Sequence, residues 1–144
     1  GVFAGSYRSP QNQMHYITVA STGNSTDFGD LTVGRADAAG CGSASRGLIG
    51  GGRDPNNSRL NTIDYITIAT PGNATDFGDL TVARSALCSA GSTTRAVFAA
   101  GDTGSATNVI DYVAIDTAGN ATDFGDCTTA RYYRSAMSDT SRYM

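Results

Sequence analysis

The sequence contains no lysine, no glutamate and no tryptophan, so all ten basic residues are arginine and all thirteen acidic residues are aspartate. Lysine and glutamate favour helices and are poor strand formers, whereas aspartate is common in turns. Their absence argues against a helical protein. The composition therefore predicts strands joined by tight turns, with very little helix.

Histidine is almost absent as well, because His15 is the only one. A single histidine on a predicted strand provides neither a zinc-ligand cluster nor a Ser-His-Asp triad. The formal net charge of −3 gives no electrostatic reason to expect nucleic acid or an anionic membrane as a partner. No apolar run approaches the length of a membrane span.

Three cysteines are present, Cys41, Cys88 and Cys127. They occupy different positions of the repeat described below, so they are not a repeated ligand or disulfide position. Cys127 stands where other copies have Leu31 and Leu80, which favours a small apolar core residue. We expect buried free thiols, and one bridge between neighbouring strands is the alternative.

What the sequence does contain is an internal repeat. The sequence Thr-Asp-Phe-Gly-Asp occurs three times, and its first aspartates, Asp27, Asp76 and Asp123, are 49 and 47 residues apart. A repeat of this length is typical of solenoids, propellers and other arrays. The copies divide the chain into units 1–46, 47–95 and 96–144, the last of which ends with the first residues of a next strand. We expect open edges at both ends and a longer parent array.

The middle unit predicts four short strands. Residues 47–52 and 62–70 are apolar or β-branched and are separated by a turn-rich loop. Residues 80–84 and 86–90 are the other two expected strands. Four short antiparallel strands in a repeat of 40 to 50 residues are the pattern of a propeller blade.

These features resemble the kelch repeat family. The glycine pair Gly51-Gly52 after an apolar strand, the strand tyrosine Tyr65 and the segment 83–85 carry the resemblance. No tryptophan follows the tyrosine, and we interpret the phenylalanine of each copy as filling that space between blades. The resemblance implies an all-β fold, a section of a kelch-like β-propeller with three four-stranded blades. Since a ring needs about four to eight blades, further sequence or oligomerisation would complete it.

The sequence Ile-Asp-Tyr-Ile-Thr-Ile, followed by Gly-Asn-Ala-Thr-Asp-Phe-Gly-Asp-Leu-Thr, resembles repeats in virion structural and tail-appendage proteins of marine bacteriophages, including cyanophages. This resemblance implies a non-enzymatic module of the virion, used for assembly or attachment to the host surface. Its partners would be further blades or copies of the same protein, other virion proteins and a cell-surface glycan. A lectin-like or protein-binding kelch module of a secreted, non-viral protein is the alternative, and an enzyme with its active site in further blades is a third.

The repeated acids and arginines are the first candidate residues. A catalytic site is normally unique, so threefold repetition favours a structural role, in which Asp76 and Asp79 cap turns or pair with Arg84 or Arg95. A calcium loop at these aspartates is a weaker alternative, because their number and spacing do not match an EF-hand. We therefore expect no catalytic residue, no metal and no cofactor. The structural repeat positions are Asp27, Phe28, Asp30, Arg35, Asp76, Phe77, Asp79, Arg84, Asp123, Phe124, Asp126 and Arg131.

The loops differ more among the copies than the strands do. Varied loops on a rigid framework are common places for recognition, and these three loops are expected to project from one rim. Ordinary solvated loops are the alternative interpretation. The candidate recognition residues are Tyr7, Arg8, Arg53, Asp54, Asn57, Arg59 and Asp102.

Overall fold

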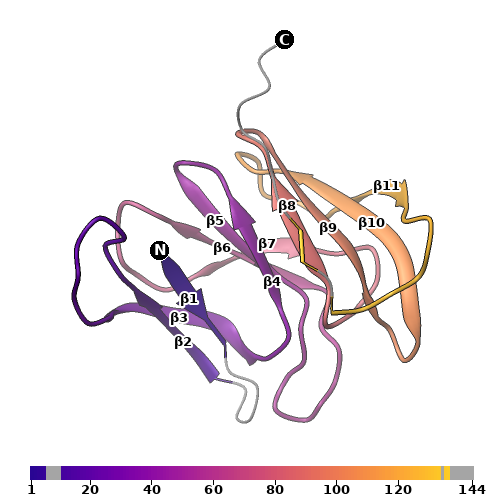
Figure 1. The fold of residues 1–144 in the computed structure, drawn as a ribbon, viewed down its shortest axis with the longest axis horizontal. Helices are drawn as coiled ribbons and strands as arrows, with labels where there is room; N and C mark the ends of the chain where they lie inside the picture. Colours follow the sequence, from indigo (N-terminus) through magenta and orange to yellow (C-terminus); the bar gives the residue numbers. More distant parts are fainter. Residues whose placement is uncertain (6–10, 134, 137–144) are drawn as a thin grey trace.

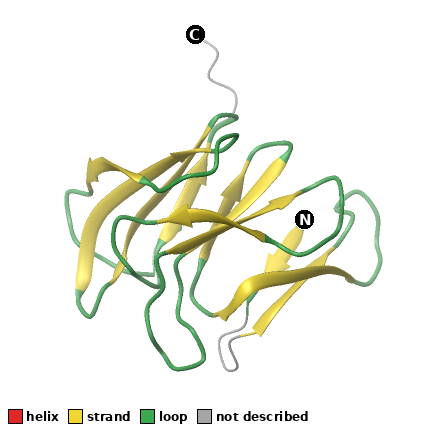
Figure 2. Ribbon diagram, turned by 180° about the vertical axis from the view of Figure 1, so that it is seen from behind, coloured by secondary structure: helices red, strands yellow, loops and turns green. Residues whose placement is uncertain are grey.

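The computed structural model describes residues 1–5, 11–133 and 135–136, and every regular element in these ranges is a β-strand. Figure 2 shows strands and loops without a helix in the described part of the chain. The all-β class predicted from the composition is confirmed. With no helix among these residues, none is long and apolar enough to cross a membrane.

Three antiparallel sheets follow one another along the chain and across the molecule (Figure 1). The N-terminal sheet has the order β1 (Val2–Ala4), β2 (Gln11–Tyr16) and β3 (Thr26–Arg35). The middle sheet consists of β4 (Ala39–Gly42), β5 (Arg46–Gly50), β6 (Thr62–Thr67) and β7 (Thr75–Asp79). The C-terminal sheet consists of β8 (Cys88–Gly91), β9 (Arg95–Asp102), β10 (Ala106–Ala114) and β11 (Thr122–Asp126). None of the described sheets closes on itself.

The sheets do not coincide with the sequence units 1–46, 47–95 and 96–144. Strands β4 and β5 form a hairpin whose turn contains Ser43, and Ser43 Oγ accepts bonds from the amides of Ser45 and Arg46 at 3.3 Å each. Ser92 does the same for the β8–β9 turn. Through these serine turns, β4 pairs with β5 and β8 pairs with β9. The unit boundaries at residues 46 and 95 therefore fall inside hairpins.

The sequence Thr-Asp-Phe-Gly-Asp forms a strand, although it lies outside the four strands expected for the repeat. In the middle unit the strand is β7, whereas the expected strand at residues 80–84 is irregular. The reason is a β-bulge: Ile63 lies opposite Gly78 but Asp64 lies opposite Asp76, which leaves Phe77 as the extra residue. Gly78 has φ +142°, a conformation that residues with a side chain rarely adopt.

The same bulge occurs in all three sheets, with register shifts after Met14, Ile63 and Ile110. The equivalent glycines, Gly29 and Gly125, have φ +136° and +131°. An apparently turn-like sequence therefore gives a bulged edge strand and directs its phenylalanine onto one face of the sheet.

The hydrophobic core lies between the sheets rather than within one. One cluster joins Met14, Phe28 and Leu31 of the N-terminal part of the chain to Ile66 of the middle sheet. A larger cluster joins the middle and C-terminal sheets and contains Ala39, Leu48, Ile63, Phe77, Leu80, Leu87, Ala96, Phe98, Val113 and Ile115. Two junctions of similar composition thus hold three sheets together.

Candidate interaction surfaces

A buried arginine–aspartate pair crosses each of the two junctions between sheets. Arg35, at the end of β3, donates to Asp64 of β6 at 2.9 Å, and Arg84, after β7, donates to Asp111 of β10 at 2.8 Å. All four side chains are completely buried. In each case the arginine belongs to one sheet and the aspartate to the next, so the repeat places the same ion pair at both junctions.

A threonine completes each pair. Thr32 donates to Asp64 through its amide at 3.0 Å and its hydroxyl at 2.7 Å, and Thr81 donates to Asp111 at 3.2 and 2.6 Å. Each buried carboxylate therefore accepts bonds from three groups of the preceding sheet. We refer to the groups Arg35–Thr32–Asp64 and Arg84–Thr81–Asp111 as the Arg–Asp junctions. Such satisfaction is what a buried charge requires, because removing one partner leaves an uncompensated charge in the interior.

The electrostatics of the first junction show these opposing effects. Burial lowers the pKa of the Arg35 guanidinium, while the attraction of Asp64 and its hydrogen bond act in the opposite direction. Arg35 also donates to the carbonyl of Thr62 at 2.9 Å, which further binds it to the middle sheet. The junction is thus an ion pair supported by backbone acceptors.

Arginine–aspartate pairing is predicted from the sequence, but the predicted partners of Arg84 and Arg95 are wrong. Arg84 pairs with Asp111 rather than with Asp76 or Asp79. Arg95 instead lies over the ring of Tyr112, 4.9 Å from its centroid. Asp64 and Asp111 were missed as site residues. Their signal was an acid at the same place in two otherwise apolar strands, where burial demands a cation.

Two further aspartates of the repeat bond to the backbone of their own bulge. Asp27 and Asp123 accept the amides of Gly29 and Gly125 at 3.2 Å each and so cap the bulge. Asp76 lies at the bulge opposite Asp64.

Asp30 and Asp79 mark a second repeated contact, at the outer edge of each junction. The amide of Asp30 donates to Asn73 Oδ1 at 3.0 Å, and the amide of Asp79 donates to Asn120 Oδ1 at 3.1 Å. A Cβ added at Gly29 or Gly78 would lie 2.4 Å from the backbone of the glycine that precedes each asparagine, so only glycine fits. The Gly-Asn turns therefore link neighbouring sheets, a role that sequence reasoning did not assign.

Phe28 and Phe77 are buried at the two junctions, with 4% and 2% of their surface exposed. Each makes an edge-to-face contact with the tyrosine of its own sheet, Tyr16 or Tyr65, at 5.9 Å between ring centroids. These two phenylalanines occupy the space between neighbouring sheets.

No protein-family model matches this chain, and no curated protein matches it. The kelch and bacteriophage resemblances therefore stay hypotheses.

The outer face of the C-terminal sheet differs from the equivalent faces of the other two. Phe124 is 55% exposed, and Arg131, the equivalent of Arg35 and Arg84, is exposed. Nothing lies within 4 Å of a Cβ added at Gly125. Asp126 is likewise exposed, and Cys127 is half-buried although its equivalents Leu31 and Leu80 are buried. The same residues that form a junction twice are uncovered here.

The loop residues proposed for recognition form an internal network. Arg53 donates to Asp102 at 2.9 Å and to Asn57 at 3.1 Å, and Arg59 donates to the same Asp102 oxygen at 2.9 Å. Asp54 accepts the amides of Asn56 and Ser58 within its turn.

Asp102 is the centre of this network. Its hydrogen bonds to Arg59 and to the amide of Gly104 hold the pKa of Asp102 below its usual range. The loop at residues 53–59 and the end of β9 are therefore joined. Tyr7 and Arg8 lie outside the described residues.

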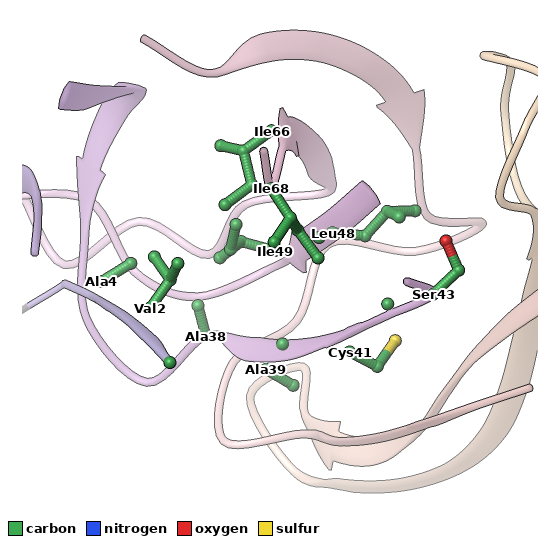
Figure 3. A pocket seen from close by; sticks show the side chains of 14 residues that line it. Val2, Ala4, Ala38, Ala39, Cys41, Ser43, Leu48, Ile49, Ile66 and Ile68 are labelled. Carbon is green, nitrogen blue, oxygen red and sulfur yellow. The ribbon is translucent and has the colours of Figure 1, made fainter. Parts of the chain in front are cut away.

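A groove of about 540 Å³ lies between the N-terminal and middle sheets (Figure 3). Val2 and Ala4 of β1 line one side, and Ala39 and Cys41 of β4 line another, with Ile66 and further apolar groups between them. Strands β5 and β9 each have an additional strand at the corresponding edge, namely β4 and β8, whereas β1 is the edge strand of the described N-terminal sheet. The groove therefore follows an uncovered strand edge lined by small and apolar residues.

Cys41 and Cys127 are free thiols, and all three cysteines are half-buried. Burial raises the pKa of the Cys41 thiol to about 11, which keeps it protonated at neutral pH. No group of three or more His, Cys, Asp or Glu side chains suited to a metal ion occurs within the described ranges. His15 is exposed on β2, in the position that Asp64 and Asp111 occupy in the other sheets.

Proposed function

We propose that this chain is a non-enzymatic section of a β-propeller in a bacteriophage virion or tail appendage, used for assembly or for attachment to the host surface. The observation that supports this proposal best is the use of the repeated residues. Arg35 and Arg84, Asp64 and Asp111, and the phenylalanines between them form the same contact at successive sheets. Residues that form these repeated contacts join the sheets to one another and do not form a unique reaction centre.

The sheet arrangement supports the propeller part of the proposal. Each sheet is antiparallel with strands in chain order, and successive sheets pack face to face through their cores. The first strands of the middle and C-terminal sheets lie side by side, since Ser89 Oγ of β8 donates to the carbonyl of Gly40 in β4 at 2.7 Å (Figure 1). In a propeller these would be the strands nearest the axis, and further blades would complete the ring.

The loop network supports the attachment part. Arg53, Arg59 and Asp102 hold two loops in one arrangement by 2.9 Å ion pairs, so their polar groups are presented without the cost of ordering a mobile loop. Charged and amide groups in a fixed arrangement suit a glycan or a polar protein surface. The virion location rests on the sequence resemblance given above.

Immunogold electron microscopy of phage particles whose genomes encode this sequence tests the location. Antibodies raised against the purified chain are expected to label intact virions, at the tail or an appendage. Label confined to the soluble fraction of the lysate, with bare particles, would overturn the virion assignment and favour a secreted module. Binding of the labelled chain to host cells, weakened in Asp54→Ala/Asn57→Ala but not in Thr18→Ala, tests attachment separately.

A further inference from the structure

The uncovered face of the C-terminal sheet has the same backbone arrangement as the faces that form junctions. The amide of Gly101 donates to the carbonyl of Arg131 at 2.9 Å, as Gly52 donates to Arg84 at 2.9 Å. The amide of Arg131 donates to Thr107, as that of Arg84 donates to Leu60. Two residues after each arginine the backbone has φ between 52° and 55°, at Asp37, Ala86 and Tyr133. The backbone of Arg131 is therefore held in the same way as the backbone of Arg84, whose side chain forms a junction.

The aromatic part of the face is also preformed. Tyr112 and Phe124 meet edge to face with ring centroids 5.9 Å apart, the same distance as between Tyr65 and Phe77. Phe77 is covered by the next sheet, whereas Phe124 is 55% exposed. Phe124 and Arg131 are both exposed, and aromatic residues and arginine are the anchors that dominate protein interfaces.

The edge of β11 is the third preformed element. Gly125 has φ +131°, close to the values at Gly29 and Gly78, which accept the backbone of a Gly-Asn turn from the next sheet. The space next to Gly125 is free of atoms within 4 Å of an added Cβ. At each of the two internal junctions, the neighbouring sheet contributes a Gly-Asn turn, an apolar strand and a buried aspartate. By comparison, these are the groups that would cover the exposed face of the C-terminal sheet.

Resting on the proposed function, we propose that this face, formed by Tyr112, Phe124, Gly125 and Arg131, docks a further sheet of the same repeat type that carries an aspartate in the place of Asp64 and Asp111. Continuity with the two internal junctions supports this occupant, and so does the positive charge of Arg131. A sheet without the aspartate would bury a guanidinium with no carboxylate, which is costly.

A second copy of the chain satisfies only part of this requirement. Its N-terminal sheet offers a Gly-Asn turn at Gly23-Asn24, and Phe3, which is 57% exposed, stands where Phe98 packs in the C-terminal sheet. The acid, however, is replaced by His15. An imidazole provides at most one acceptor where Asp111 accepts bonds from both Arg84 and Thr81. The unmodified copy is therefore a poor occupant.

This difference gives a test by gain of binding. The variant His15→Asp converts the N-terminal sheet of the full chain into the required occupant, and His15 is exposed, so the substitution is compatible with folding. Sedimentation velocity should show that His15→Asp associates head to tail about thirtyfold more tightly than the unmodified chain, in line with the effect of a buried interfacial charge pair. Thr18→Asp, which adds the same charge at another exposed position of this region, should associate as the unmodified chain does.

A second substitution locates the contact. His15→Asp/Arg131→Ala is expected to lose the added association, and circular dichroism would verify that it remains folded. The inference is overturned if His15→Asp associates no better than Thr18→Asp, if the unmodified chain associates equally tightly, or if the double variant still associates. Virion labelling is independent of these results. Labelled virions together with a His15→Asp variant that does not associate would contradict only this inference. Unlabelled virions together with an associating variant would contradict only the virion location.

Discussion

The middle sheet and the C-terminal sheet contain the same repeated residues in the same geometry, but only the middle sheet is covered on both faces. Arg84 is completely buried against Asp111, whereas Arg131 is exposed. Phe77 is 2% exposed and Phe124 is 55% exposed, although each makes the same contact with its tyrosine. The repeated residues of the two sheets thus have the same local backbone but different surroundings.

This contrast separates what a repeat encodes locally from what its neighbour provides. The bulge, the aromatic pair and the backbone at the arginine form in each sheet, because their contacts lie within that sheet or its own turns. Burial and the ion pair require the aspartate of the next sheet. The same side chain should therefore matter greatly to stability in one sheet and little in the other.

The largest expected effect is at the arginines. Arg84→Ala should lower the free energy of unfolding by about 3–5 kcal/mol, because Asp111 would stay buried without its partner. Arg131→Ala should change it by less than about 0.5 kcal/mol, since the side chain is exposed. Urea unfolding followed by circular dichroism measures both. Equal effects at the two positions would contradict the comparison.

Substitutions at Phe77 and Phe124 should also differ in their effect on the free energy of unfolding, but by less than those at the arginines. Phe77→Ala is expected to cost about 3–5 kcal/mol through lost burial and a cavity between sheets. Phe124→Ala should cost less than about 1.5 kcal/mol, the range of an aromatic pair contact. Thermal and urea unfolding of the two variants give the comparison directly, and Phe28→Ala serves as a second buried reference.

Much of the fold was predictable from the sequence, and the exceptions share a cause. The repeat and the composition predicted the all-β class, and the spacing predicted several strands per unit. The strand at residues 75–79 was missed because Asp-Phe-Gly-Asp has turn-forming residues, and only pairing with β6 shows that Phe77 is a bulge residue. Local propensity does not contain that pairing.

The junction partners were missed for a related reason. Asp64 lies 29 residues from Arg35, and Asp111 lies 27 residues from Arg84, so no local pattern joins them. Their pairing depends on how successive sheets stack. The candidate recognition residues Arg53, Arg59 and Asp102 were predicted as polar loop groups, but the 2.9 Å contacts among them also arise only from the stacking.

A smaller effect concerns the Asp102 network, which joins the loop of the middle sheet to β9. Folding lowers the pKa of Asp102, so its carboxylate stabilises the fold above the unfolded-state pKa of about 3.9. That stabilisation is lost as the pH falls through the lower pKa of the folded state. Since the network is partly exposed, the loss should not exceed about 1 kcal/mol. Asp102→Asn should remove this part of the acid dependence, measured by urea unfolding at pH 7 and below pH 4. An unchanged difference between the two conditions would show that Asp102 does not contribute.

The smallest expected change in the free energy of unfolding is for a substitution at Ala100, which is equivalent to Gly51 of the middle sheet. Gly51 has φ +65°, and its equivalent Ala100 has φ +58° although it carries a side chain. Ala100→Gly relieves that conformation, which costs about 1–2 kcal/mol, but it also makes the unfolded chain more flexible and removes a buried methyl group. The net change in the free energy of unfolding should stay within about 1 kcal/mol. Gly51→Ala is the matched reverse change, and it should be clearly destabilising because the added Cβ would lie 2.6 Å from the carbonyl oxygen of Arg84. If both substitutions were neutral, the close approach at Gly51 would not constrain the middle sheet more than the C-terminal one.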